Sequence, residues 1–448
     1  MQTVQVILIF VVLFGAVALM MTKKLPAILA LPLIGILVAF IAGVPFMTPG
    51  EDEQTICSFV INAGSGRLAS TIIVTIFGAI FAKLIEKQGI AENIIHKAAE
   101  LAGDKPLAMA LALTAATVII FVGMSGAGPV IMVCTIAVPL LLAAGVTPVV
   151  SASLILLGLT VGLMINVSQY QMYIDTLGMT QDQVRSMSVV LAVIGAIVTV
   201  AYIVINVRRK PVRSSWAMPA ADNERRQVNP VALVMPLLPF ILVFFLKIDA
   251  LTSLIIAILI TVLITTPRKI VSVLSACFIE GIKDVAAVIG LMIGIGILLN
   301  GVTANATKAL IEPIIAHIVP GSPIVYVLFF AILSPLALYR GPLNMAGMGS
   351  GLAAIMLAAG TMNPFAVGMA LRCNTFVQCA SDPTNTQNVI CADFAHVDVN
   401  DVLKSTLPYT MVMCLLGLIY SAIFIFCENR QTASRAPCVR PAHRGRIQ

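Results

Sequence analysis

Long apolar segments constrain the fold of this chain more than any other feature. Fourteen runs of 14 to 21 mostly apolar residues follow one another as far as residue 426. A helix needs about 20 apolar residues to cross a hydrocarbon core about 30 Å thick. The chain is 59% hydrophobic and 10% charged, whereas soluble domains are about 45–50% apolar and about 25% charged. These values exclude a soluble enzyme, a nucleic-acid reader and a disordered scaffold. They predict an all-α polytopic membrane protein with about ten spans.

The two halves of the chain repeat the same short motifs at nearly constant spacing. Five pairs of motifs occur in the same order, 212 to 216 residues apart. Internal repeats of this size are typical of secondary transporters. The pairs are Gly89-Ile-Ala and Gly301-Val-Thr, Gly128-Pro129 and Gly341-Pro342, Ala143-Ala-Gly145 and Ala358-Ala-Gly360, Pro148 and Pro364, and Gln171 and Gln387.

The repeat and the polar segments predict how the chain is divided. Each half contains more apolar runs than spans, so two neighbouring runs are interpreted as a re-entrant helical hairpin and the next run as a discontinuous helix. The predicted parts are a first repeat over 1–207, with its hairpin at 107–145 and its broken helix at 148–178; a cytoplasmic linker over 208–229; a second repeat over 230–427, with its hairpin at 323–360 and its broken helix at 364–395; and a C-terminal tail over 428–448.

Positive charges predict the orientation of the spans, because cytoplasmic loops carry an excess of Lys and Arg. With the N-terminus outside, sixteen of these residues fall on the cytoplasmic side, whereas Arg67, Arg185, Lys247 and Lys308 fall outside. Only the arginines of the C-terminal tail disagree. The first repeat then begins outside and the second begins inside. The repeats are therefore predicted to be inverted. The predicted location is the inner (plasma) membrane, as a multi-pass protein.

Four polar, glycine-rich breaks interrupt the apolar sequence, one at each hairpin tip and one in each following helix. Non-helical backbone persists at membrane depth only where it is buried in protein or lines a wet cavity. The freed helix ends offer N–H groups to anions and carbonyl groups to cations. We therefore predict a binding site at the breaks; turns at the membrane surface are the alternative. The breaks are Gly123-Met-Ser-Gly-Ala-Gly-Pro129, Asn166-Val-Ser-Gln-Tyr-Gln171, Tyr339-Arg-Gly-Pro-Leu-Asn344 and Ser381-Asp-Pro-Thr-Asn-Thr-Gln-Asn388.

Charged residues within the apolar sequence are rare and mark candidate functional positions. A charge at mid-membrane costs at least about 2.5 kcal/mol on insertion scales. Arg340 lies at the second hairpin tip and Arg372 in the second broken helix, and a guanidinium suits a carboxylate. The alternative for either arginine is a structural ion pair with Asp382. Asp382 is the only carboxylate in the second break, and the first repeat has Asn166 at the matching position.

These motifs resemble the ion-transporter superfamily of secondary carriers, which includes citrate–proton/metal symporters, gluconate permeases and sodium–dicarboxylate symporters. The resemblance covers about 25–426 and is most specific in the segments 123–129 and 333–344. It implies that the hairpin tips and helix breaks bind substrate and cation, and that the protein is a homodimer with a scaffold and a moving transport domain. In this chain Ser381, Asn385 and Thr386 are not contiguous, which leaves both a proton and sodium as coupling ions.

The sequence favours cation-coupled symport of a small organic anion, such as citrate, gluconate or another hydroxycarboxylate, by alternating access. A cation/proton antiporter with Asp382 as the exchanger is the alternative. No catalytic triad, nucleotide loop or metal-ligand cluster occurs in the sequence, so we predict no enzyme activity, no cofactor and no bound metal. The expected partners are the anion and the lipid bilayer. The predicted substrate-binding residues are Ser125, Gly126, Asn166, Ser168, Gln171, Arg340, Gly341, Asn344, Arg372, Asn374, Asn385 and Thr386, and the predicted cation-coupling residues are Ser381, Asp382 and Thr384.

Overall fold

The fold is helical throughout the part of the chain that the computed structural model describes. This part comprises residues 2–22, 24–47, 54–103, 105–209, 228–318, 322–345, 347–358 and 362–434, and it contains no strand. The prediction of an all-α membrane protein is therefore confirmed. Most of the predicted linker (208–229) and of the C-terminal tail (428–448) lies outside the described residues.

Seven helices among the described residues are long and apolar enough to cross a membrane, and five shorter apolar helices accompany them. The sequence predicted about ten spans. The difference arises because several apolar runs form helices of 15 to 17 residues. At 1.5 Å per residue such helices are only about 23–26 Å long, which is shorter than the hydrocarbon core.

Two helices at matching positions of the predicted repeats are alike. Helices α8 and α17 both have 18 residues and both begin with a proline, whose fixed φ suits the first turn of a helix. An inverted relation between the halves stays a prediction. The elements of the first half are α1 Gln2–Met21, α2 Ala27–Ile41, η1 Ile56–Ala63, α3 Gly64–Gly66, α4 Ala69–Lys87, α5 Ile90–Ala102, α6 Pro106–Gly123, α7 Ala127–Ala143, α8 Pro148–Ile165, η2 Val167–Gln169, α9 Tyr170–Leu177 and α10 Gln181–Arg209. Those of the second half are η3 Pro230–Leu237, α11 Leu238–Phe245, α12 Ala250–Thr265, η4 Pro267–Lys269, α13 Ile270–Thr303, α14 Asn305–Ile318, α15 Pro323–Leu333, η5 Ser334–Arg340, α16 Met348–Ala358, α17 Pro364–Ser381, α18 Thr386–Phe394 and α19 Val399–Ser434.

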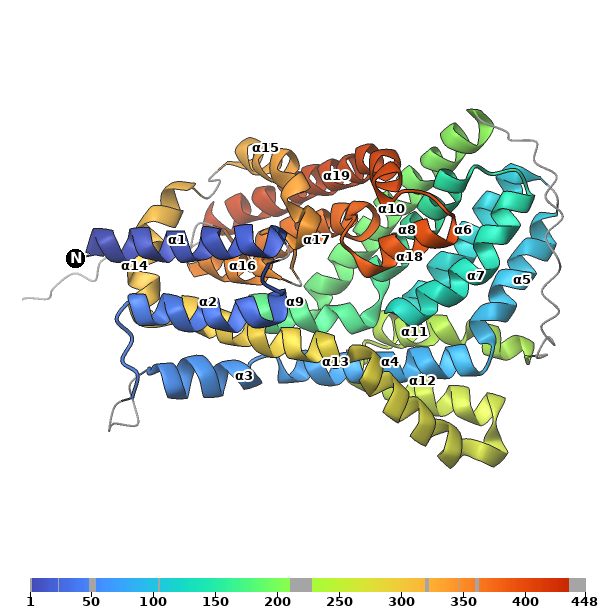
Figure 1. The fold of residues 1–448 in the computed structure, drawn as a ribbon, viewed down its shortest axis with the longest axis horizontal. Helices are drawn as coiled ribbons and strands as arrows, with labels where there is room; N and C mark the ends of the chain where they lie inside the picture. Colours follow the sequence, from blue (N-terminus) through green and yellow to red (C-terminus); the bar gives the residue numbers. More distant parts are fainter. Residues whose placement is uncertain are drawn as a thin grey trace, which may run out of the picture.

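The long helix α13 packs side by side with α2, α3 and α4 (Figure 1). Glycines bring these helices together, since small residues let two helix backbones approach closely. A Cβ on Gly296 of α13 would lie 2.2 Å from the carbonyl oxygen of Gly64, and one on Gly301 would lie 2.2 Å from that of Gly35. We call α2, α3, α4 and α13 the α13 layer.

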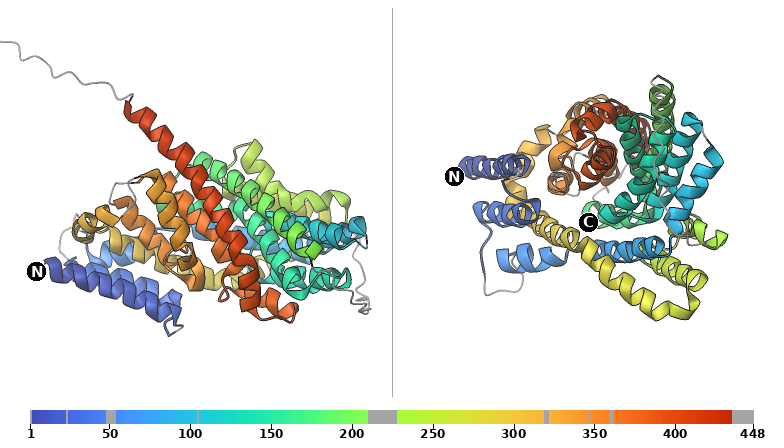
Figure 2. Two further views of the ribbon diagram at one scale, coloured as in Figure 1. Left: turned by 90° about the horizontal axis from the view of Figure 1, so that it is seen from above. Right: turned by 45° about the vertical axis from the view of Figure 1, so that its right-hand side comes forward.

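A second group of helices, the central bundle, consists of α6, α8, α10, α17 and α19, which pack on one another. Figure 2 shows α19 running diagonally across this bundle. The bundle joins the two halves, because α8 and α10 come from the first and α17 and α19 from the second. The short helix α9 packs on α4, and α16 packs on α13, so segments next to the helix breaks meet the α13 layer.

One span begins earlier than the sequence suggested, and this corrects the position of Arg67. The sequence placed Arg67 in an outer loop, whereas the span runs from Ile56 to Lys87. The guanidinium of Arg67 donates to Oδ1 of Asn300 at 2.6 Å and to the Thr303 hydroxyl at 3.3 Å. Polar and small residues around Gly64 lower the local hydropathy, and α3 packs on α13.

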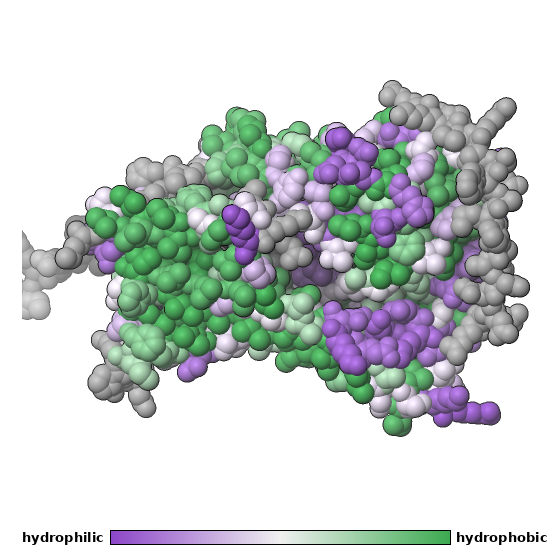
Figure 3. Space-filling view, in the orientation of Figure 1, coloured by the Kyte–Doolittle hydropathy of each residue, from purple (hydrophilic) through white to green (hydrophobic). Residues whose placement is uncertain are grey.

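The surface separates into apolar and hydrophilic regions. Figure 3 shows apolar side chains covering the face formed by α1 and α2, which fits contact with lipid. Hydrophilic side chains gather over the end of α4 and the adjoining part of α13. Ion pairs between these two helices lie in this region: Lys83 pairs with Asp284, and Lys87 pairs with Glu280.

Candidate functional site

The first helix break (166–169) is organised by the side chain of Asn166. Helix α8 ends at Ile165, and Oδ1 of Asn166 accepts hydrogen bonds from the backbone N–H and the hydroxyl of Ser168, at 2.9 and 2.5 Å. Nδ2 of Asn166 donates to the carbonyl oxygens of Phe121 and Met124, at 2.9 and 3.0 Å. The amide therefore joins the break to the end of α6, next to the first hairpin tip. A carboxylate here would place negative charge against two carbonyl oxygens, so the position requires an amide.

The second helix break (382–385) has the same local geometry with a charged residue. Asp382 has φ −76° and ψ 111°, close to the −69° and 119° of Asn166. Its Oδ1 accepts from the backbone N–H and the hydroxyl of Thr384, at 2.9 and 2.7 Å. Asp382 is fully buried. The two breaks thus have the same turn geometry but differ in charge, because Asp382 replaces the neutral Asn166.

Arg372 lies where α17 meets the end of α8. Its side chain is 2% exposed, and Nη2 donates to the carbonyl oxygens of Leu163 and Met164, at 3.0 and 3.1 Å. These carbonyls belong to the last turn of α8, where a helix carries partial negative charge. The guanidinium also lies over the ring of Tyr173 in α9, 5.0 Å from its centroid. Arg372 therefore connects the second broken helix to both parts of the first.

The Nε edge of this guanidinium donates no hydrogen bond to a described residue. Nε of Arg372 is buried and has no hydrogen-bond partner among the described residues. A buried donor of a charged group without a partner is costly. An anion with a free oxygen at this edge would satisfy the donor.

Three other predicted residues form hydrogen bonds with partners other than Arg372. The Ser381 hydroxyl lies 2.9 Å and 3.0 Å from the hydroxyls of Thr406 and Thr410 in α19. Asn374 donates to the carbonyl oxygen of Ala370 at 2.9 Å and lies against α19. Gln171 donates to Asp175 at 2.7 Å. The structure thus separates Ser381 and Asn374 from the contacts that Arg372 makes.

The first hairpin tip lies beside charged residues of the α13 layer. Ser125 is half-buried and Gly126 is exposed. A Cβ on Gly128, in the first turn of α7, would lie 3.3 Å from Nζ of Lys83 and 3.4 Å from a carboxylate oxygen of Glu86. Nζ of Lys83 lies 3.0 Å from Glu86 and 3.0 Å from Asp284. Lys83, Glu86 and Lys87 lie on one helix face at a spacing of three and four residues, and this spacing is the sequence signal for the cluster.

The second hairpin tip is a compact turn. A Cβ on Gly341 would lie 2.0 Å from the carbonyl oxygen of Leu336, so only glycine fits there. Asn344 is 7% exposed, and its carbonyl oxygen accepts from the N–H groups of Gly347 and Gly349. The side chain of Arg340 lies outside the described residues.

Helix α18 begins directly after the second break, without a side-chain cap. The preceding Asn385 donates from Nδ2 to the carbonyl oxygen of Gln378 at 3.3 Å, and its side chain does not accept from the first turn of α18. Thr386, the first residue of α18, is exposed. The N–H groups of a first turn attract anions, so this helix end suits an anionic group.

Comparisons with known proteins give structural neighbours but no relative by sequence. No protein-family model matches the chain, and no curated protein is similar to it in sequence. The YdaH transporter of Alcanivorax borkumensis, described as having an unusual topology, is similar in structure with a TM-score of 0.63 at 13% identity, over 90% of this chain and 98% of that one. MtrF of Neisseria gonorrhoeae, from a class of antimetabolite efflux pumps, is similar with a TM-score of 0.57 at 14% identity, over 90% of this chain and 96% of that one.

At these identities the likeness shows the fold alone. The chain shares this fold with two membrane transporters over nearly their whole length. The more specific resemblance to citrate and gluconate carriers stays a prediction.

Proposed function

We propose that this protein is a secondary active transporter that moves a small organic anion together with a cation by alternating access. The observation that carries the proposal is the buried guanidinium of Arg372, whose Nε has no partner among the described residues. Arg372 belongs to the second broken helix, and its guanidinium contacts the end of α8 in the first broken helix. Broken helices from two halves of a chain are where secondary transporters bind substrates.

The substrate is a small carboxylate. A carboxylate oxygen suits the free edge of a guanidinium, because charge-assisted hydrogen bonds of this kind are short and strong. The uncapped N-terminus of α18, beside Asn385 and Thr386, offers a second contact to an anion. Citrate, gluconate and other hydroxycarboxylates add hydroxyl groups, which the polar side chains of the breaks can bind.

Asp382 couples the cation. It is the buried carboxylate of the second break, and the matching Asn166 of the first break is neutral. A carboxylate at this depth can take up a proton, or ligate sodium together with the Thr384 hydroxyl, which it already contacts. The Ser381 hydroxyl contacts those of Thr406 and Thr410. Ser381 contributes to cation coupling through this hydroxyl cluster, which lies next to Asp382 in sequence.

Uptake measurements on proteoliposomes test the proposal. Labelled citrate or gluconate is expected to accumulate only when an inward proton or sodium gradient is imposed. Separate pH and sodium gradients identify the coupling ion. Accumulation that ignores both gradients would contradict coupled transport, and lack of transport for a panel of carboxylates would contradict the substrate class.

A second candidate is export of the anion in exchange for an entering cation. The observation that favours it is the shared fold with MtrF, which belongs to a class of antimetabolite efflux pumps. The same proteoliposomes distinguish the two directions. An inward-directed proton or sodium gradient accelerates anion uptake in symport, whereas in exchange it accelerates loss of preloaded anion. A cation/proton antiporter would instead move cations with no carboxylate present.

Replacing Gly78 by valine is expected to reduce transport about tenfold. A Cβ on Gly78 of α4 would lie 3.0 Å from Cβ of Ser168, so a larger side chain pushes the first break away from the α13 layer. Overpacking of this kind costs about 1–3 kcal/mol. A cost of about 1.4 kcal/mol lowers the population of the correctly packed break about tenfold. The matched control is Gly66→Val in the same span, because a Cβ on Gly66 has no neighbour within 4 Å among the described atoms. Equal losses in both variants would show that the contact with Ser168 does not matter.

A further inference from the structure

A basic cavity lies at one end of the α13 layer, apart from the helix breaks. It has a volume of about 860 Å³ and is formed by the end of α4, the start of η3 and the connection between α12 and α13. On the orientation predicted from charge it opens at the cytoplasmic surface. The residues that line it include Lys87, Val228, Asn229, Thr266, Arg268 and Lys269.

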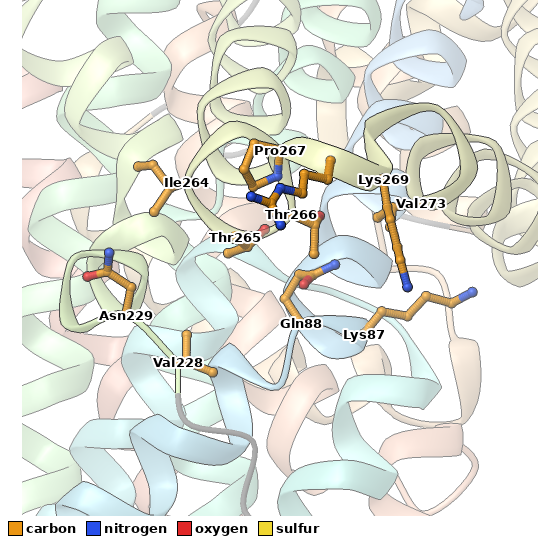
Figure 4. A pocket seen from close by; sticks show the side chains of 11 residues that line it. Lys87, Gln88, Val228, Asn229, Ile264, Thr265, Thr266, Pro267, Lys269 and Val273 are labelled. Carbon is orange, nitrogen blue, oxygen red and sulfur yellow. The ribbon is translucent and has the colours of Figure 1, made fainter.

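The described residues that line this cavity include three cations and no carboxylate. Lys87 is paired with Glu280 at 2.5 Å, which offsets one of the charges. Arg268 and Lys269 are exposed and form no ion pair with another described residue. Figure 4 shows the side chains of Lys87 and Lys269 ending near each other, with Asn229 and Val228 on the opposite wall. Two uncompensated positive charges thus face one hollow.

The polar and apolar groups of the cavity are arranged for an amphiphilic anion. The hydroxyl oxygen of Thr266 is buried and has no hydrogen-bond partner among the described residues. Arg268 and Lys269 belong to the turn that leads into α13, where the helix end adds partial positive charge. Ile264, Val228 and Val273 supply an apolar side. Basic pockets at the cytoplasmic ends of membrane helices suit anionic lipid head groups.

We propose that this cavity binds a phosphate group, held by Arg268, Lys269 and the Thr266 hydroxyl. The phosphate can belong to an anionic phospholipid of the inner leaflet or to a soluble phosphate compound. Both share the same chemistry at the cations, and only the lipid also uses the apolar side. The proposal is independent of the transported substrate, because none of the lining residues belongs to a helix break.

Thermal unfolding of the full-length protein in detergent tests this site. The six described cysteines that are buried become accessible on unfolding, so a thiol-reactive dye reports the transition. Dioleoyl phosphatidylglycerol is expected to raise the unfolding temperature, whereas phosphatidylcholine is not. In the double variant Arg268→Gln/Lys269→Gln the concentration for half-maximal stabilisation should rise about 30-fold, since each cation near an anionic head group contributes about fivefold.

The control is the double variant Lys97→Gln/Lys105→Gln, which removes the same charge from exposed positions outside the cavity. Its response to phosphatidylglycerol should match that of the unmodified protein. Stabilisation by inorganic phosphate that is lost only in the Arg268/Lys269 variant would identify a soluble ligand and would also support the site. Equal weakening in both double variants, or no stabilisation by either probe, would overturn the proposal.

Discussion

Replacing Arg372 by lysine is expected to lower kcat/KM for anion transport by about 100-fold or more. Lysine keeps the charge but lacks the planar fork that reaches two acceptors and still leaves Nε for a ligand. The guanidinium donates to the carbonyls of Leu163 and Met164, and a hydrogen bond from a charged group contributes about 1.5–3 kcal/mol. Because 1.4 kcal/mol is tenfold, losing one such bond to the substrate and distorting another accounts for this reduction. Initial uptake rates over a range of anion concentrations measure the effect.

A merely structural role of Arg372 predicts a different result. If it only caps α8, the lysine variant should unfold at lower temperature but keep the stabilisation that the anion confers. If it also binds the anion, that stabilisation should disappear. Arg67→Lys is the matched control, because Arg67 is also within a span and donates to Asn300 and Thr303, away from the breaks. Anion-dependent stabilisation that survives in Arg372→Lys would contradict a binding role.

Much of the fold could be predicted because its signals are local in sequence. Lengths of apolar runs predict helices, and glycine- and proline-rich interruptions predict where they end. The ends of α8 at Ile165 and of α17 at Ser381 coincide with polar segments that the sequence identified. The equivalence of Asn166 and Asp382 was visible as a repeat offset of 216 residues, and the two turns have nearly the same backbone angles.

The direction of each side chain could not be predicted in the same way. Ser381 and Asp382 are neighbours in sequence, yet the hydroxyl of Ser381 contacts α19, whereas the carboxylate of Asp382 accepts a hydrogen bond from the N–H of Thr384. Arg67 was placed in a loop because hydropathy alone cannot show that Gly64 packs on α13. The cluster of Lys83, Glu86 and Asp284 depends on the contact between α4 and α13. Each of these features requires knowing which helices are neighbours.

Replacing Asp382 by asparagine is expected to abolish cation coupling while the second break keeps its shape. The first break shows that asparagine supports this turn, because Asn166 accepts the same two hydrogen bonds at nearly the same backbone angles. The variant therefore removes the charge and retains the acceptor. With one coupled proton, a gradient of one pH unit drives about tenfold accumulation of the anion. The variant should reach a ratio of about 1.

Two further variants separate the charge of Asp382 from other effects. Asp175→Asn changes another carboxylate, which accepts from Thr71 at 3.0 and 2.7 Å and from Gln171 at 2.7 Å. It is expected to lose about 1–2 kcal/mol of stability and to keep gradient-driven accumulation. Asn166→Asp combined with Asp382→Asn moves the carboxylate to the first break. This exchange should not restore coupling, because Nδ2 of Asn166 donates to Phe121 and Met124 and a carboxylate there has no proton to donate. Gradient-driven accumulation by Asp382→Asn equal to that of the unmodified protein would assign the coupling to another group.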